Sequence, residues 1–544
     1  MKKLLDSIEM PTFLFPAILV LLAIVIGIGW PQQFGEAASA ALGFITQGFG
    51  WYYALIMTFL VAFCVYMAVS KYGNIRLGGE DAKPEMSFFT WFSIALTSGL
   101  AIGIVFYAVG EPLGNFTTPP GFAGYEANSA EAAEGALKYV FMHWGLHPYA
   151  AYTGIGLCLA FLIWNGKKKS QVSTALIPLI GEERANGTLG KFINGICIFT
   201  FLGALGTSLG LAVMQIASGI NYAFGVNIPE LLVAVVVIFG FAAFYIIAAC
   251  SGLHKAIKHI SNMNMYMYFA ILAFALVFGG LLFILNNTTT SIGEYLAIIV
   301  PQSFYLEPGI ASGWINGWTI FYWGWWMAAA PLVGLFLVKL AKGRTIRQFV
   351  LVNMLAPTLF AIVWFGVFGS SAINLEMLNP GSISEDVAEL GIAVSIFSYF
   401  KQLPFPTLLA IVVLVVIVFS YVTMAESNTL VMADMTTKED VLAEREAEGK
   451  GSPKPLRIFW GAMLALIAFA LYFSGGLTAL QTSAVACALL IMIMVPFMCI
   501  SCIRSFRNRS AYDKTLSEEE RMRLKEEEDR ALAIEDQPRN EGVS

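Results

Sequence analysis

Residues 97–103 read Thr-Ser-Gly-Leu-Ala-Ile-Gly, inside an apolar stretch, 88–111, that is long enough to cross a membrane. Residues 325–331 read Trp-Trp-Met-Ala-Ala-Ala-Pro inside a second such stretch, 315–340. The glycines of the first stretch disfavour a helix, and the proline of the second removes an internal hydrogen bond, so we expect both spans to be interrupted there. Interrupted spans at matching places in two halves of a chain are typical of the midplane ligand site of secondary transporters.

Ten further apolar stretches surround these two. About 20 mainly apolar residues cross the hydrocarbon core of a membrane. This length predicts twelve spans, near 13–31, 50–70, 88–111, 142–164, 194–222, 230–250, 265–286, 315–340, 347–373, 403–430, 456–474 and 478–503. Basic residues gather in every second connection and at both ends of the chain. Only Lys138 and Lys401, of 32 lysines and arginines, fall in the opposite connections, which predicts that both termini are cytoplasmic.

The interrupted spans are five helices apart, which predicts an internal repeat. Spans 3–7 and 8–12 form two halves of five helices, and because five is odd the halves insert with opposite orientation. The predicted organisation is a short cytoplasmic N-terminus, two additional helices, a first repeat, an outer amphipathic segment, a second repeat and a charged cytoplasmic tail: 1–12, 13–87, 88–286, 287–314, 315–503 and 504–544.

The composition predicts an all-α polytopic membrane protein. Hydrophobic residues make up 58% of the chain and charged residues 13%, whereas soluble domains carry about 25% charged residues. The net charge is -5, and no basic domain stands out, which argues against a nucleic-acid partner. All seven cysteines lie in or beside apolar stretches, without disulfide or metal-ligand spacing in the connections.

Aromatic residues gather beside the second predicted interruption. Trp314 and Trp318 fit a belt at the membrane interface, but Trp325 and Trp326 lie about two helical turns deeper. Span 4 adds three further rings, Trp144, Tyr149 and Tyr152. Aromatic faces that converge without a countercharge favour a quaternary ammonium group, which has no N–H to donate. Ordinary core packing is the alternative for each single ring.

Other titratable residues in the spans are candidates for metal binding, proton coupling or catalysis. His143 and His147 are four residues apart, a spacing that can hold a metal, but neither a third ligand nor a general base lies nearby in the sequence. Glu426 in span 10 is a candidate for proton coupling, although it lies near the cytoplasmic end, where it could be hydrated. A membrane-embedded enzyme would need a convergent nucleophile, base or metal set, and the chain has only four histidines. We expect a transporter rather than an enzyme.

Five segments resemble the betaine/carnitine/choline transporter family, and the likeness covers roughly residues 10–503. These are Gly-Glu-Pro at 110–112, His-Trp-Gly-Leu-His-Pro at 143–148, Gly-Thr-Ser-Leu-Gly-Leu at 206–211, the aromatic string at 318–326, and Gly-Arg-Thr-Ile-Arg at 343–347. The resemblance implies a LeuT-type inverted-repeat core of ten helices with two extra N-terminal helices. It also implies alternating access, a place in the plasma membrane and a homotrimer.

The resemblance also implies a site. Position by position, the cage of this family would be Trp144, Tyr149, Tyr152 and Trp326, with Trp325 in a second aromatic set along the path. Tyr149 stands where tryptophan is usual, and Ala329 stands where the family has tryptophan or tyrosine, so the pocket should be wider or less aromatic on one side. The interrupted stretch of span 3 would approach the ligand through Gly99, Ala101 and Gly103.

One substitution within the family pattern bears on the substrate. Choline carriers of the family have an aspartate where this chain has Gly103. A ligand with its own carboxylate needs no such partner, because unwound backbone N–H groups can hold that carboxylate. This favours a zwitterion such as glycine betaine or carnitine, and an aspartate at position 103 should shift the preference toward choline.

The residues that indicate whether transport is coupled to sodium disagree. Sodium-driven members place adjacent Thr and Ser hydroxyls in span 10, whereas this chain has Thr423 and Met424, and a thioether is a poor ligand for sodium. Sodium-independent carnitine exchangers carry an arginine where this chain has Asn264. We favour symport with Na⁺, and the alternative is sodium-independent exchange; no other cofactor is implied. The candidate ligands for the ion are Thr423, backbone carbonyls near Thr97 and Leu100, and Thr207 or Ser208.

Overall fold

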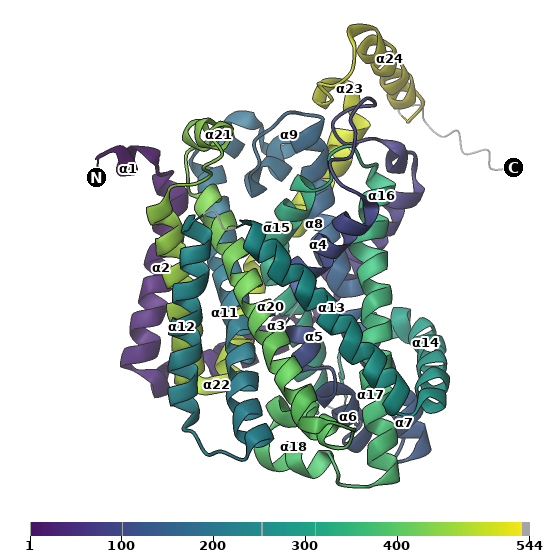
Figure 1. The fold of residues 1–544 in the computed structure, drawn as a ribbon. Helices are drawn as coiled ribbons and strands as arrows, with labels where there is room; N and C mark the ends of the chain where they lie inside the picture. The colour runs from purple at the N-terminus through teal and green to yellow at the C-terminus, as the bar shows by residue number, and fades with distance from the viewer. Residues whose placement is uncertain (1, 101, 252–253, 310–311, 536–544) are drawn as a thin grey trace, which may run out of the picture.

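The structure is a computed structural model that describes residues 2–100, 102–251, 254–309 and 312–535. For residues 2–3, 89, 96–100, 254–258 and 532–535 it describes the backbone only. Long helices run side by side through one bundle, and helices α1 (Lys2–Ser7) and α24 (Glu518–Glu535) lie at the same end of it (Figure 1). The described residues form helices and connections, with two isolated β-bridges.

Ten helical segments of the described chain are long and apolar enough to cross a membrane. They comprise α2 (Met10–Gly29), α3 (Pro31–Val69), α7 (Ala130–Trp144) with α8 (Leu146–Trp164), α11 (Thr188–Phe224), α12 (Glu230–Ser251), α13 (His254–Phe278), α15 (Phe321–Lys339) with the turn before it, α16 (Ile346–Val350) through α17 (Ala356–Leu378), α20 (Pro406–Met435) and α22 (Lys454–Arg507). The protein is therefore an all-α polytopic membrane protein.

The helix of span 3 is interrupted, as the small residues at 97–103 predict. It consists of α4 (Phe88–Leu100), α5 (Gly103–Phe106) and α6 (Gly110–Thr117). None of these three pieces reaches the length of a membrane span on its own. Tyr107 lies between α5 and α6 and is buried.

The predicted interruption at 325–331 is wrong. Helix α15 runs without a break from Phe321 to Lys339 and contains Pro331. Helix α15 is buried along its length and packs closely on α8: a Cβ on Gly334 would lie 2.9 Å from the backbone nitrogen of Gly156. Close neighbours of this kind hold a membrane helix straight although proline removes one hydrogen bond. The irregular part comes earlier, as a π-helical turn at Asn316–Ile320.

A second interruption lies in span 4, where the sequence predicted one continuous helix over 142–164. Helix α7 ends at Trp144 and α8 begins at Leu146, with Gly145 at φ -93° and ψ -127° between them. A Cβ on Gly145 would lie 2.3 Å from the carbonyl oxygen of Phe141. Only glycine fits there, directly after the buried Trp144.

Two boundaries differ from those predicted. Helix α13 ends at Phe278, before Gly280 at φ 95°, so span 7 does not extend to 286. Helix α14 (Leu281–Ser303) occupies much of the predicted segment 287–314.

Spans 11 and 12 form the 54-residue helix α22, interrupted by non-helical backbone at Gly475 and Gly476. Gly476 has φ 53°, a conformation in which glycine carries no steric cost.

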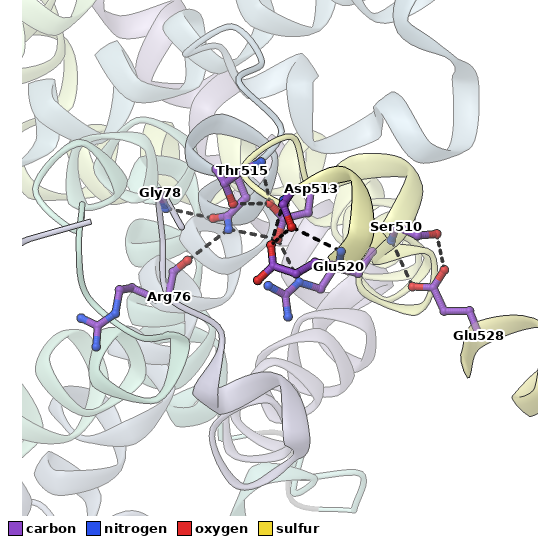
Figure 2. Close-up of polar contacts among 10 residues, drawn as sticks. Arg76, Gly78, Ser510, Asp513, Thr515, Glu520 and Glu528 are labelled. Carbon is purple, nitrogen blue, oxygen red and sulfur yellow. Dashed lines mark hydrogen bonds and ion pairs between the residues drawn. The ribbon is translucent and has the colours of Figure 1, made fainter. Parts of the chain in front are cut away.

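The segment after α22 folds back on the connection that follows α3 (Figure 2). Asp513, which is 1% exposed, accepts hydrogen bonds from Arg509 Nε at 2.8 Å and from Asn165 Nδ2 at 3.3 Å. Asn165 also donates to the carbonyl oxygen of Arg76 at 3.1 Å and accepts from the backbone nitrogen of Gly78 at 3.0 Å. One buried carboxylate and one amide therefore join the C-terminal segment to the end of α8 and to the connection after α3.

Replacing Asp513 by alanine should release this segment. A hydrogen bond to a charged group contributes about 1.5–3 kcal/mol, and its loss leaves the Asn165 amide without one of its acceptors. We expect a lower Tm and faster tryptic cleavage between α22 and α24 in the purified variant. Glu519→Ala, in the exposed first turn of α24, is the matched control. Equal cleavage rates in both variants would contradict the role given to Asp513.

Candidate functional site

A small cavity lies at the level of the interruption in span 3, between α8, α11, α15 and α20. Its volume is about 30 Å³, which holds two or three water molecules at roughly 10–15 Å³ each. Five aromatic residues line it, Trp144, Tyr152, Phe201, Trp325 and Trp326. The described part of the chain brings these five rings together from three helices and the end of a fourth.

Trp326 is the centre of the aromatic group. Its ring centroid lies 5.5 Å from that of Trp144, at 86°, and 5.3 Å from that of Tyr152, at 63°. Tyr149 contacts the same indole at 5.7 Å, from outside the cavity wall. The N–H of Trp326 has no hydrogen-bond acceptor among the described residues. The site thus combines edge-on aromatic contacts with one free indole donor.

Most of the ligand-binding residues predicted from the sequence lie together. Trp144, Tyr152, Trp325 and Trp326 line the cavity, as do Ala329 and Gly103, whereas Tyr149 lies one layer behind. Ala101 lies outside the described residues, as do the side chains of Thr97, Gly99 and Leu100.

Among the described residues, the wall contains no carboxylate and no basic group. Its polar members are Ser208 on α11 and Asn428 on α20, and the thioether of Met424 faces the same space. Sequence reasoning missed Asn428 and Phe201, since nothing in their local pattern distinguishes them from core residues. The only sequence signal for Asn428 is that it lies four residues after Met424, which places both on the same face of one helix.

Gly103 lies in the wall, close to two indole rings. A Cβ on this residue would lie 2.8 Å from Cη2 of Trp144 and 3.0 Å from Cη2 of Trp325. The absence of a side chain at position 103 therefore allows the two indoles to converge on the interrupted backbone.

The candidate ligands for the ion do not all line the cavity. Thr423 is half-buried and its hydroxyl donates to the carbonyl oxygen of Phe419 in its own helix. The hydroxyl of Thr207 donates to the carbonyl oxygen of Leu480 at 2.6 Å, whereas Ser208 lines the cavity and donates to Ala204 at 3.2 Å. Among the candidates whose side chains are described, Ser208 alone touches the cavity.

A buried polar network lies directly behind the cavity wall. Glu111, at the start of α6, is 0% exposed and accepts hydrogen bonds from Nε1 of Trp144 at 2.8 Å and from the hydroxyl of Tyr322 at 2.7 Å. Its other oxygen lies 2.6 Å from Nδ1 of His143, and Nε2 of His143 lies 2.9 Å from the hydroxyl of Thr319. The network joins the interrupted span 3, the end of α7 and the π-helical turn before α15.

Sequence reasoning placed Glu111 in a family-like segment but assigned it no role, because its partners come from distant parts of the chain. It also treated His143 and His147 as one pair. The two histidines have separate partners: His147 bonds to the hydroxyl of Ser303 at 2.9 Å and stacks on Trp323.

A polytopic helical bundle with a small aromatic cavity beside an interrupted helix, whose described wall residues include no acid, is the architecture expected of a membrane transporter for a ligand that aromatic rings can bind. Comparison with known proteins agrees. Residues 11–511 match the family model described as "BCCT, betaine/carnitine/choline family transporter".

The chain is 35% identical to a probable glycine betaine transporter of Desulfitobacterium hafniense, with 90% of this chain and 96% of that protein covered. It is also 35% identical to the glycine betaine transporter OpuD of Bacillus subtilis (89% and 91% covered). Identity to an ectoine/hydroxyectoine transporter of Virgibacillus pantothenticus is 34% (92% and 97% covered). The chain belongs to the betaine/carnitine/choline transporter family. It is a secondary transporter for quaternary ammonium compounds, not an enzyme.

Proposed function

We propose that this protein imports a small zwitterionic quaternary ammonium compound, such as glycine betaine or a carnitine-like molecule, across the plasma membrane. Transport proceeds by alternating access and is coupled to Na⁺. The observation that carries this proposal is the cavity wall, in which three of the four predicted cage rings meet and no described residue is an acid. The fixed methyl groups of a quaternary ammonium suit ring faces, to which desolvated cations are attracted by about 2 kcal/mol or more.

The charge of the wall favours a zwitterion over a net cation. With Gly103 in place of an acid, a net cation such as choline has no carboxylate in the wall to neutralise it. A zwitterion brings its own carboxylate, and the N–H of Trp326 and the backbone at the interruption of span 3 are donors for it. We assign the ammonium end to Trp144, Tyr152 and Trp326, with Tyr149 supporting Trp326 and with Trp325 and Ala329 completing the wall.

For the fold we propose twelve spans with a LeuT-type core. The ten long helical segments become twelve if α4–α6 counts as one interrupted span and α22 as two spans that meet at Gly475 and Gly476. Spans 3–7 and 8–12 are then the two inverted halves, and both termini are cytoplasmic, in keeping with the alternation of basic connections. We also propose the homotrimer that the family resemblance implies.

The small size of the cavity supports alternating access. A space of about 30 Å³, enough for about two or three waters, is too small for a molecule that carries both a trimethylammonium group and a carboxylate. The rings of Trp144 and Trp326 must therefore separate to admit a ligand. Relative movement of α15 against α8 and α11 would open the cavity toward one side of the membrane at a time.

A competition panel tests the substrate assignment. Glycine betaine, carnitine, ectoine and choline should each be titrated against a labelled betaine on the purified protein, with and without sodium. We expect the betaines to compete most strongly and choline least. If choline binds best, the zwitterion assignment is wrong. If no quaternary ammonium compound binds, the cavity is not the ligand site.

Coupling can be tested through the two residues of span 10 on which the signals disagree. If Na⁺ drives uptake with Thr423 as a ligand, Thr423→Val should weaken the apparent sodium affinity more than the ligand affinity. Met424→Ser should strengthen it, because a hydroxyl oxygen suits sodium better than a thioether. Uptake into proteoliposomes under an imposed sodium gradient measures both effects. Full activity in sodium-free vesicles preloaded with ligand, and none with the gradient alone, would establish exchange instead.

A further inference from the structure

Asn428 is a polar residue of the cavity wall to which the proposed cage gives no role. It lies on α20, the helix that also presents Met424 to the cavity, and none of the five rings of the wall comes from α20. Asn428 is only 8% exposed, so its amide is buried within the bundle. A buried amide requires hydrogen-bond partners, because leaving its polar atoms unpaired costs free energy.

Three of the hydrogen-bond donors in the wall already have an acceptor. The hydroxyl of Ser208 donates to the carbonyl oxygen of Ala204 at 3.2 Å, and the indole N–H of Trp325 donates to the same oxygen at 3.2 Å. The indole N–H of Trp144 donates to Glu111 at 2.8 Å. Because a hydroxyl and an indole each carry a single proton to donate, none of these groups can donate to a ligand without losing the bond it has.

Two other polar side chains of the wall have no such commitment. The hydroxyl of Tyr152 and the amide of Asn428 form no hydrogen bond with a described residue, and neither group is sealed off within the protein. The N–H of Trp326 also lacks a described acceptor, but it is enclosed until the rings of the cavity separate. Tyr152 serves the ammonium end of the ligand with its ring, so Asn428 is the wall residue whose available chemistry is purely polar.

We propose that Asn428 determines the preference for a zwitterion by donating a hydrogen bond from its amide nitrogen to the carboxylate of the ligand. The inference rests on the proposed function and deepens it, because it names a side chain that recognises the acidic end of the ligand. Asn428 touches the substrate directly and acts together with the backbone N–H groups at the interruption of span 3.

The chemistry of an amide suits this role. The side-chain nitrogen of asparagine carries two N–H donors, and the group is uncharged. A carboxylate that enters the cavity loses its hydration, and hydrogen bonds to a charged group are stronger than those between neutral groups. The amide therefore favours a ligand with a carboxylate over a net cation such as choline. It also does not repel that carboxylate, as an acidic side chain would.

The wall is long enough to separate the two ends of such a ligand. On α15 the lining residues extend from Trp325 to Val333, which is eight residues (333 - 325 = 8) or about 12 Å of helix. The three cage rings of the wall come from α7, α8 and α15, whereas Asn428 comes from α20. The rings and the amide therefore approach the ligand from different helices.

The test compares glycine betaine with its carboxamide, in which a neutral amide replaces the carboxylate, by calorimetric titration of the purified full-length protein. Asn428→Leu keeps the size of the side chain and removes its donors. It should weaken binding of glycine betaine about tenfold or more, as expected for a hydrogen bond to a charged group, and binding of the carboxamide by a smaller factor.

Ser427→Ala is the matched control on the same helix. The hydroxyl of Ser427 donates to the carbonyl oxygen of Thr423 at 2.9 Å, and Ser427 does not line the cavity. This variant should keep the wild-type ratio of the two affinities. Equal losses for both ligands in Asn428→Leu, or the same change of ratio in Ser427→Ala, would show that Asn428 acts through packing and would overturn the inference.

Infrared spectroscopy provides a second measurement that does not require the carboxamide to bind. With glycine betaine labelled with carbon-13 at the carboxylate, a hydrogen bond shifts the carboxylate stretching band of the bound ligand. The band should therefore differ between the wild type and Asn428→Leu at saturating ligand, and Asn428→Ala replaces the leucine variant if that one does not fold. An identical band in variant and wild type would overturn the inference. Failure of the wild type to bind any quaternary ammonium compound would instead overturn the proposed function.

Discussion

Replacing Trp326 by leucine should lower the affinity of the purified protein for its quaternary ammonium ligand by roughly thirtyfold, the equivalent of a desolvated cation–π contact of about 2 kcal/mol. The expectation rests on the central place of this ring, which lies 5.5 Å from Trp144 and 5.3 Å from Tyr152. Leucine keeps an apolar side chain but removes the negative ring face.

Isothermal titration calorimetry suits the Trp326 comparison, because the variant loses a fluorescent reporter. Trp51→Leu is the control, since Trp51 is exposed on α3, away from the cavity. The variant should elute from size-exclusion chromatography as the wild type does. An unchanged affinity would place the ligand elsewhere in the bundle.

Substitution of Gly103 by alanine should have a comparable effect for a steric reason. The added Cβ would lie 2.8 Å from Trp144 and 3.0 Å from Trp325, so at least one indole must move. Overpacking of this kind costs about 1–3 kcal/mol, and we expect a loss of affinity of fivefold or more. Gly114→Ala is the control, because a Cβ there meets nothing within 4 Å. Equal affinities in these two variants would show that the indoles are free to separate.

The same crowding modifies the expectation for aspartate at position 103. From the sequence alone, aspartate should turn the preference toward choline. In the structure its side chain must also displace Trp144 or Trp325, so the affinities for glycine betaine and choline should both fall. Choline should lose less, since it alone gains a carboxylate partner. Competition between the two ligands measures the ratio of their affinities. If this ratio does not move toward choline, the 97–103 stretch does not line the carboxylate end of the site.

The sequence predicted those features that depend on local composition. Small residues at 97–103 leave the helix weakly supported, and the structure interrupts it there. The spacing of Trp144 and Tyr152 along span 4 indicated a shared face, and both line the cavity. The membrane class follows from charge and hydropathy, which need no knowledge of contacts.

The features that sequence reasoning missed depend on distant neighbours. Proline at 331 interrupts an isolated helix, but the packed surroundings of α15 keep it continuous. Gly145 looks like any other glycine in an apolar stretch, and only its approach to Phe141 shows why α7 and α8 separate there. Glu111 acquires its partners from positions 143, 144 and 322, which no pattern within one span can reveal.

The contact between Asn165 and Asp513 has a consequence for how the protein is made. Arg76 and Gly78 lie more than 400 residues before the carboxylate that completes their hydrogen-bonded network (513 - 76 = 437). At a synthesis rate of roughly 5–20 residues per second, about 20–90 seconds separate the translation of the two segments. During that interval every span up to α22 enters the membrane while this junction is incomplete. Closure of the junction is therefore a late step of biogenesis, and chains that stall before it would expose an unfinished face to cellular proteases.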